Sequence, residues 1–310
     1  FCFESGPMPD AYMIILLRTL EITGEEWLIK QLTDRLLSTQ QANGAWKLFY
    51  DEENGNLSAT VEAYFALLYS GHVDPNSIQL QRAKSFITKN GGITNTITLT
   101  KAMLAVTGQI PWPKHLRFPI EAILIPPSAP ISFYDMVSYA KVHFAPILIA
   151  SNHNFSLTTK HTPNLSNLIN KRYPNDLELE STETRFILSH IKQELQHLFE
   201  LPQQLKQHAL KQAEKFMLDR VEPDGTLYSY LSSTFFMVFA LLAQGYPKND
   251  PVIAKALEGL KNLLCMTEDT YFMENNTSTV WDTALISDML QRADVPAAED
   301  TIKKATSYIL

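Results

Sequence analysis

The sequence predicts an all-α fold built from repeated helical hairpins. Three stretches carry an alanine followed three residues later by an aromatic residue, at Ala83–Phe86, Ala213–Phe216 and Ala305–Tyr308, and a looser copy begins at Ala256. The last three starts lie about 45 residues apart, which suits one hairpin per repeat. Such hairpins either close into an α/α barrel or stack into an open solenoid, and the repeat alone leaves both open.

Glycine turns are expected between the two helices of a hairpin. Asn43-Gly44-Ala45-Trp46 precedes the apolar stretch 58–69, and Asp224-Gly225-Thr226-Leu227 precedes 232–243. Asn-Gly and Asp-Gly favour turns because glycine adopts positive φ at little cost. We expect Ser58, and Ser232 or Ser233, to cap the second helices.

The pattern is interrupted in the middle and at both ends. Prolines break up 111–132, and the polar segment 153–180 is predicted to be a surface insertion. Residues 304–310 supply only the first helix of a repeat, and residues 1–20 resemble the end of another. Because a repeat cannot bury its face without a neighbour, we expect flanking sequence at both ends.

Composition limits the classes of partner. The 310 residues are 45% apolar, and 33 acidic against 26 basic residues give a formal net charge of -7. This charge repels a phosphate backbone, so nucleic acid is not an expected partner. Two distant cysteines exclude a disulfide framework and favour a reducing, cytoplasmic location. The longest apolar runs reach about half of the ~20 residues that a membrane span needs.

Metal and nucleophile signals are weak. His190, Glu194 and His197 fall on one face of a predicted helix, but His-Glu-x-x-His is absent and a solvated helix face is the favoured interpretation. No Gly-x-Ser-x-Gly occurs either. We expect neither a metal nor a cofactor.

Gln40, Gly44 and Trp46 form the most specific motif: a glutamine, three residues, a glycine, one residue and a tryptophan. A glutamine at a helix end can bond backbone groups left open there, and the tryptophan can stack over it. This would tie successive hairpins together; an ordinary turn with a buried tryptophan is the alternative. Val221 and Leu227 replace the glutamine and tryptophan in a second copy, where we expect a weaker tie.

The spacing resembles the QW motif of the squalene–hopene and oxidosqualene cyclase families. Within these families, segments 224–230 and 277–287 particularly resemble the sporulenol synthase branch, the tetraprenyl-β-curcumene cyclases. Further segments match in the same order: Thr60-Val61-Glu62-Ala63-Tyr64, Gly91-Gly92-Ile93, Gly108-Gln109-Ile110-Pro111-Trp112, Phe133-Tyr134, Ser138-Tyr139-Ala140-Lys141 and Ser278-Thr279-Val280-Trp281-Asp282-Thr283.

The resemblance implies two α/α-barrel domains, one inserted in the other, with the substrate cavity between them. It assigns 1–20 to the edge of the flanking catalytic barrel, 21–280 to the inserted barrel and 281–310 to the start of the return into the catalytic barrel. The family's acid motif, Asp-x-Asp-Asp, is absent here. We therefore expect no catalytic residue in this chain and no cyclisation by this chain alone. Asp282 is a candidate to approach the acid across the interface.

The implied substrate is a polyprenyl hydrocarbon of the squalene or tetraprenyl-β-curcumene type, cyclised through carbocations. A cation over an aromatic face gains roughly 0.5 to 2 kcal/mol. A buried core role is the alternative for most of these aromatic residues. By the resemblance, the cavity wall contains Trp281, Tyr139, Trp112, Tyr230, Leu231 and Ser232.

The resemblance also implies a peripheral, monotopic contact with the inner face of a membrane. Segments 118–130 and 133–142 offer apolar surface for it, unless they are buried core. Two other functions compete with the cyclase. One is a non-catalytic α/α-barrel module that binds a protein or an isoprenoid. The other is a prenyltransferase β-subunit, whose zinc ligands from Asp, Cys and His have no match here.

Overall fold

The computed structural model is mostly helical and describes residues 4–130, 132–170, 203–267, 270–277, 279–295 and 298–309. Short 3-10 turns lie at 93–95, 114–116, 120–124, 133–135 and 166–168. The helices are α1 (Met8–Leu20), α2 (Glu26–Thr39), α3 (Leu57–Ser70), α4 (Ile78–Lys89), α5 (Thr98–Val106), α6 (Ser138–Asn152), α8 (Gln203–Leu218), α9 (Leu231–Ala243), α10 (Pro251–Lys261), α11 (Thr279–Arg292) and α12 (Glu299–Ile309).

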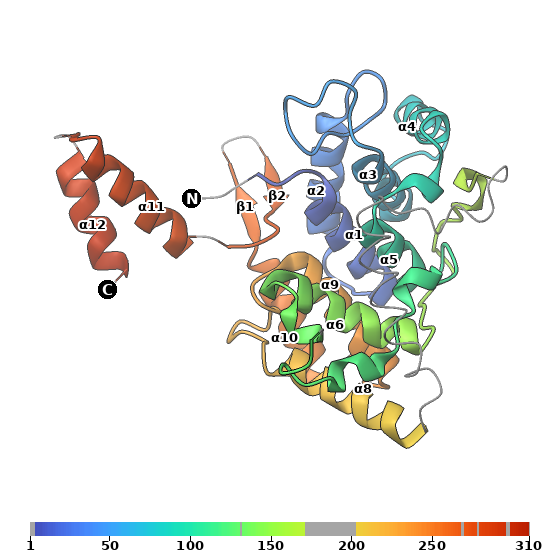
Figure 1. Ribbon diagram of the computed structural model, residues 1–310. Helices are drawn as coiled ribbons and strands as arrows, with labels where there is room; N and C mark the ends of the chain where they lie inside the picture. Colours follow the sequence, from blue (N-terminus) through green and yellow to red (C-terminus); the bar gives the residue numbers. More distant parts are fainter. Residues whose placement is uncertain are drawn as a thin grey trace.

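Helix α1 lies at the centre of the body (Figure 1) and packs against α2, α3 and α9. Residues 11–17 of this helix are almost completely buried. The Tyr12 ring lies 4.6 Å from the ring of Phe235 on α9, and Phe235 in turn contacts Phe236 and Phe239. Residues 8–20 therefore lie at the centre of the body. The assignment of 1–20 to the edge of a flanking catalytic barrel stays a prediction.

The two predicted glycine turns have the same backbone geometry. Gly44 N donates to Gln41 O at 2.8 Å, and Gly225 N donates to Glu222 O at 2.9 Å. The φ angles of the two glycines are +91° and +97°, in the left-handed region that glycine adopts most easily. The turns are thus equivalent elements of a structural repeat.

Each turn lies directly on the backbone of a following outer helix. A Cβ added at Gly44 would come within 2.4 Å of the Arg82 carbonyl carbon on α4. At Gly225 it would come within 2.5 Å of the Lys255 carbonyl oxygen on α10. A side chain does not fit at either place. The neighbouring Ala83 is completely buried, so the repeated alanine marks a site of close approach.

A threonine joins each turn to the helix that follows. Trp46 N donates to Thr60 Oγ1 on α3 at 3.1 Å, and Leu227 N donates to Thr234 Oγ1 on α9 at 2.8 Å. Each hydroxyl also donates to the carbonyl four residues earlier, at 2.6 Å. The alignment of Leu227 with Trp46 is therefore confirmed in the hydrogen bonds.

The predicted N-caps were wrong. Helix α3 is capped by Asn56, whose side chain accepts from Ala59 N at 3.1 Å, and α9 starts after Tyr230 without a side-chain cap. Ser58 lies inside α3, where its hydroxyl accepts from Ile97 N at 2.9 Å. A cap has to precede the first helical residue, and these serines come after it.

The mostly helical fold confirms the predicted fold class, and a short antiparallel hairpin, β1 (Leu264–Met266) and β2 (Tyr271–Met273), is added to the helices. It packs beside α2 (Figure 1). Cys265 on β1 is disulfide-bonded. A framework of several disulfides stays excluded by the cysteine count, but cysteine usage no longer argues for a reducing compartment.

The described part of the polar insertion, 153–170, is anchored and not loosely exposed. Leu157 N donates to Val106 O at 2.8 Å. The Tyr69 hydroxyl lies 2.9 Å from Thr159 Oγ1 and 3.0 Å from Thr162 Oγ1. The rest of the predicted insertion, 171–180, lies outside the described residues.

In the apolar segment 118–130, residues 118–123 are buried and residues 126–128 are exposed. Phe118, Ile120 and Ile123 are buried, so these three residues belong to the core and not to a membrane-facing surface. No helix within the described ranges combines the length and the apolar character that crossing a bilayer requires.

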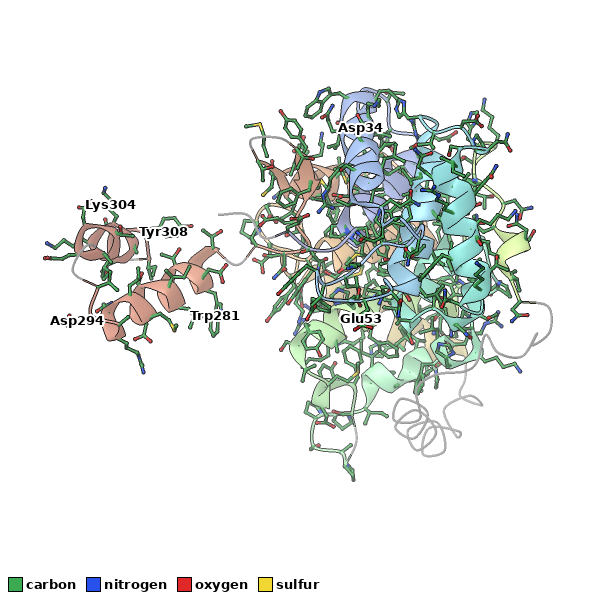
Figure 2. All side chains as sticks on the ribbon, turned by 90° about the horizontal axis from the view of Figure 1, so that it is seen from above. Asp34, Glu53, Trp281, Asp294, Lys304 and Tyr308 are labelled. Carbon is green, nitrogen blue, oxygen red and sulfur yellow. The ribbon has the colours of Figure 1, made fainter. Side chains whose placement is uncertain are left out.

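Helices α11 and α12 pack against each other and stand apart from the body (Figures 1 and 2). Trp281 on α11 is 69% exposed. A run of exposed apolar residues of this kind marks an interaction surface. The other large apolar residues of α11 that are exposed are Val280, Leu285, Ile286 and Met289.

Candidate functional site

His143 connects two of the predicted wall residues where α6 crosses the start of α9. Its Nδ1 lies 2.7 Å from the Tyr139 carbonyl oxygen, and its Nε2 lies 2.8 Å from Ser232 Oγ. The His143 ring packs edge-on against the Tyr230 ring, with 5.4 Å between the centroids. Sequence reasoning did not select His143, because nothing local to it indicates contacts with a helix 89 residues further on.

The segment after β2 joins the same cluster. Leu231 N donates to Asn275 O at 2.7 Å, and the Ser232 hydroxyl lies 3.0 Å from Asn275 Oδ1. Tyr230 pairs with Asn276 in an isolated antiparallel bridge. The first residues of α9 are thus held from both sides, by α6 and by the chain that leads to α11.

Burial differs sharply within this wall. Leu231 and Ser232 are 1% exposed, whereas Tyr139 is 60% exposed. Burial lowers the pKa of His143, and the bond to the Tyr139 carbonyl raises it by less. The imidazole is therefore neutral near pH 7.

A hollow of about 240 Å³ opens beside Tyr230. The ring of Tyr228 stacks on that of Tyr230 at a centroid distance of 6.5 Å. This volume is below the roughly 300 to 1,000 Å³ of typical ligand pockets. Its lining residues are Glu222, Tyr228, Ser229, Tyr230, Asn276 and Thr277.

The other predicted wall residues lie elsewhere. Trp112 is buried in the core, and its Nε1 donates to Phe155 O at 2.8 Å, which anchors the insertion. Trp281 and Asp282 lie on α11, away from the body (Figure 2). The described chain therefore gathers Tyr139, Tyr230, Leu231 and Ser232, and separates them from Trp112, Trp281 and Asp282.

The glutamine–tryptophan motif ties α2 to α4. Gln40 Nε2 donates to Gly44 O at 3.0 Å and to Gln79 O at 2.9 Å. The buried Trp46 donates from Nε1 to Leu36 O at 2.8 Å, a carbonyl of the last turn of α2. Such carbonyls lack helical partners, so the indole satisfies one of them.

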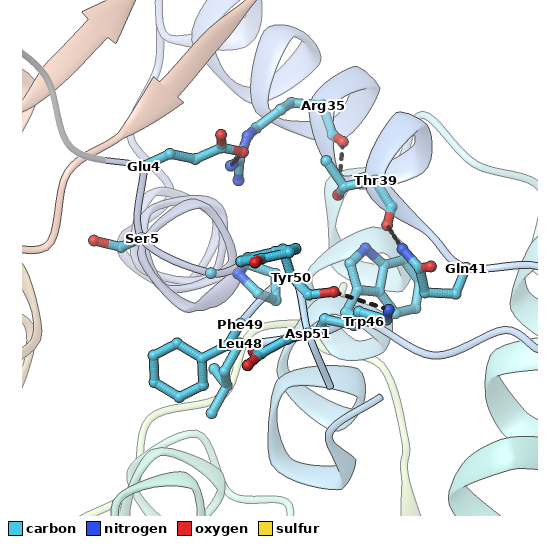
Figure 3. Close-up of a pocket in the computed structure, with 13 residues that line it drawn as sticks. Glu4, Ser5, Arg35, Thr39, Gln41, Trp46, Leu48, Phe49, Tyr50 and Asp51 are labelled. Carbon is cyan, nitrogen blue, oxygen red and sulfur yellow. Dashed lines mark hydrogen bonds and ion pairs between the residues drawn. The ribbon is translucent and has the colours of Figure 1, made fainter. Parts of the chain in front are cut away.

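A larger hollow, about 580 Å³, lies beside this motif (Figure 3). Sequence reasoning did not predict it, because it forms between segments distant in the chain. Its labelled lining residues are Glu4, Ser5, Arg35, Thr39, Gln41, Trp46, Leu48, Phe49, Tyr50 and Asp51.

The guanidinium of Arg35 in this hollow is already paired with carboxylates. Arg35 binds Glu4 and the buried Asp10, whose Oδ1 also accepts from Met273 N at 2.7 Å. Burial raises the pKa of Asp10 to about 6, although the guanidinium lowers it. Asp10 and Arg35 thus link α1, α2 and β2, which is a structural role.

Metal ligands do not gather within the described ranges: no three His, Cys, Asp or Glu side chains there could hold an ion. His190, Glu194 and His197, which we considered as ligands, lie outside those ranges. The described site offers aromatic faces, an apolar wall and a neutral imidazole. Chemically, its aromatic faces can stabilise a positive charge on a ligand that is otherwise apolar.

These features define a helical scaffold that presents part of an aromatic wall. The family model of the squalene-hopene cyclase N-terminal domain matches residues 1–269. The chain belongs to this family.

Two relatives and one solved structure illustrate the likeness. Sporulenol synthase of Bacillus subtilis is 38% identical over 100% of this chain and 49% of its own length. The squalene–hopene cyclase of Alicyclobacillus acidocaldarius is 26% identical over 89% of this chain and 43% of its own length. This chain spans about half the length of the curated relatives it matches.

A type II terpene cyclase from Scytonema, solved in complex with geranylgeranyl dihydroxybenzoate, is 16% identical. The match covers 82% of this chain and 67% of that chain, with a TM-score of 0.28. This score is too low for a comparison of how the helices are arranged.

Proposed function

We propose that this chain is the N-terminal part of a class II terpene cyclase, which converts a polyprenyl hydrocarbon into fused rings by proton-initiated cyclisation. The family match over 1–269 is the observation that carries the proposal. The chain contains no Asp-x-Asp-Asp, so the proton donor belongs to a second, catalytic barrel. In this proposal 21–280 is the inserted barrel and 281–310 leads back into the catalytic one.

The role of this chain is to supply cavity wall. Tyr139 and Tyr230 present electron-rich ring faces that stabilise carbocations, each by roughly 0.5 to 2 kcal/mol. Leu231 is buried at the start of α9 and supports this wall from inside the body. Trp281 belongs to the same cavity once the exposed face of α11 is covered by the catalytic barrel. Asp282, beside it, approaches the acid motif across that interface.

The substrate in this proposal is squalene or tetraprenyl-β-curcumene, and the likeness to sporulenol synthase favours the second. Both are hydrocarbons that dissolve in a bilayer. We include a peripheral contact with the inner, cytoplasmic face of a membrane. The exposed side chain of Val137, at 57%, is its candidate surface on the body.

The test is a conversion assay with both hydrocarbons. The complete gene product that contains this chain should form cyclic products, and the chain alone should form none, because the acid is missing. Cyclic products made by the 310-residue chain alone would overturn the division of roles. A complete product that converts neither hydrocarbon would refute the cyclase assignment.

A further inference from the structure

We propose that His143 is a positioning residue, which holds Tyr230 and the segment 274–277 in the geometry that the aromatic wall requires. This inference rests on the proposed function and adds a residue to it. His143 touches three separate parts of the fold: its own helix, the start of α9 and, through Ser232, the segment after β2. Removing its side chain releases the contacts with Tyr139 O, Ser232 and the Tyr230 ring together, and leaves Ser232 held by Asn275 alone.

The proton positions in this cluster follow from its partners. A carbonyl oxygen can only accept, so His143 Nδ1 carries a proton and donates it to Tyr139 O. In the neutral ring Nε2 then holds a lone pair, which faces Ser232 Oγ at 2.8 Å. The Ser232 hydroxyl therefore donates to the imidazole.

Asn275 completes the chain of bonds. A hydroxyl has one proton, so Ser232 cannot donate to Nε2 and to Asn275 Oδ1 at once. Turning the Asn275 amide by half a turn exchanges its oxygen and nitrogen, and Nδ2 then donates to Ser232 Oγ across the 3.0 Å contact. In this arrangement each contact has a donor and an acceptor, which buried polar groups require.

The consequence lies in what these bonds hold. Asn275 O also accepts from Leu231 N at 2.7 Å, and Asn276 pairs with Tyr230. The next described helix after this segment is α11, which carries Trp281. His143 therefore fixes both the Tyr230 ring, by direct edge contact, and the point at which the chain leaves the body toward α11.

The first experiment reads the tautomer directly. Nitrogen NMR of the labelled 310-residue chain should give a protonated Nδ1 and an unprotonated Nε2 for His143 near pH 7, and Ser232→Ala should move the Nε2 signal. A ring with its proton on Nε2, or an Nε2 signal that Ser232→Ala leaves unchanged, would overturn the proposal. This result does not depend on catalysis, so it stands even if the cyclase assignment fails.

The second experiment uses the complete gene product. His143→Leu should lower kcat about tenfold, because losing a positioning hydrogen bond is expected to raise the barrier by an amount that corresponds to a tenfold change in rate. It should also raise the share of incompletely cyclised products, with KM little changed. His143→Gln, which keeps a donor and an acceptor on the side chain, should restore part of the normal product ratio.

A matched control separates positioning from general packing. His153, at the other end of α6, also joins α6 to α9, through a 2.8 Å contact between its Nε2 and Gln244 Oε1. His153→Leu should leave the product ratio unchanged. Equal product ratios and kcat in the His143→Leu and His153→Leu proteins would contradict a positioning role.

Discussion

At the scale of single residues, one glutamine distinguishes the two turn copies. Gln40 gives two hydrogen bonds that span the turn and α4, and Val221 stands in its place in the second copy. The valine has no polar group to offer. The first hairpin is therefore tied to its neighbour by a side chain, and the second by turn packing and backbone bonds.

Gln40→Ala should lower the free energy of unfolding by roughly 1 to 3 kcal/mol, because it removes two bonds and leaves Gly44 O and Gln79 O without them. Chemical denaturation of the chain measures this. The adjacent Gln41 is the control, since its amide donates only to Thr39 O of the local backbone, at 3.1 Å. An equal loss in Gln41→Ala would mean that Gln40 does not tie the hairpins.

A second residue-scale prediction concerns the buried Glu62 on α3. Burial raises its pKa to about 7 from an ordinary 4.5, although the Thr100 hydroxyl donates to its Oε1 at 2.6 Å. Between these pKa values the folded chain holds a proton that the unfolded chain has released. Stability therefore falls as the pH rises from about 4.5 through about 7.

Glu62→Gln removes the titrating carboxyl, so the loss of unfolding free energy between these pH values should be smaller by up to roughly 3 kcal/mol. Unfolding measured by denaturant at several pH values between about 4.5 and 8 gives the comparison. Burial also raises the pKa of Asp10, to about 6, so the Glu62→Gln variant should still lose some stability as the pH rises. An unchanged pH dependence in Glu62→Gln would show that Glu62 is not the titrating group.

At the scale of elements, the turns work as contact points between hairpins. Gly225 combines a positive φ with the closest approach to α10, and Gly245 has a similar φ of +94° with open space around it. The pair separates backbone strain from packing, because only the first site has a neighbour to clash with.

Gly245→Ala should cost roughly 1 to 2 kcal/mol of stability, the cost of a left-handed backbone with a Cβ. Gly225→Ala should cost a further 1 to 3 kcal/mol or so, because the new methyl group collides with the Lys255 backbone. Thermal or chemical unfolding of both variants measures the difference. Equal losses would contradict the contact between the turn and α10.

Some elements of this fold could be predicted from the sequence alone, and others could not. The turns at Gly44 and Gly225 could be predicted because turn chemistry is local. Leu227 could be aligned with Trp46 although it has no indole ring. Capping by Asn56 was missed because a serine two residues later looked equally suitable. The hairpin of β1 and β2 was missed because each strand has only three residues.

The candidate site was less predictable, because its contacts are long-range. Tyr139, Tyr230 and Ser232 were selected through family resemblance, not through their own spacing, and their place in a substrate cavity stays a prediction. His143 and Asn275 join them through hydrogen bonds between segments far apart in the chain, which no local pattern records. Trp112 was expected near the cavity, but the structure gives it a core contact with Phe155.

At the scale of the whole molecule, α11 and α12 contact each other and stand apart from the body. The role of their exposed face can be tested at Trp281. Trp281→Ala should change the stability of the 310-residue chain by about 0.5 kcal/mol or less, because the indole is 69% exposed. In the complete gene product the same change should lower conversion strongly.

The control for this prediction is Trp27→Ala, which alters another exposed indole, 54% exposed, on α2. Conversion by the complete product should be close to normal in that variant. Normal conversion by Trp281→Ala would mean that this face of α11 does not belong to the cavity.

We propose that this chain serves a cyclisation that starts with a proton. The most direct measurement is mass spectrometry of the product that the complete gene product makes from tetraprenyl-β-curcumene or squalene in D₂O. We predict a cyclic product that carries one deuterium bound to carbon, because the initiating proton exchanges with solvent before it adds to the alkene. A cyclic product without deuterium would contradict the claim.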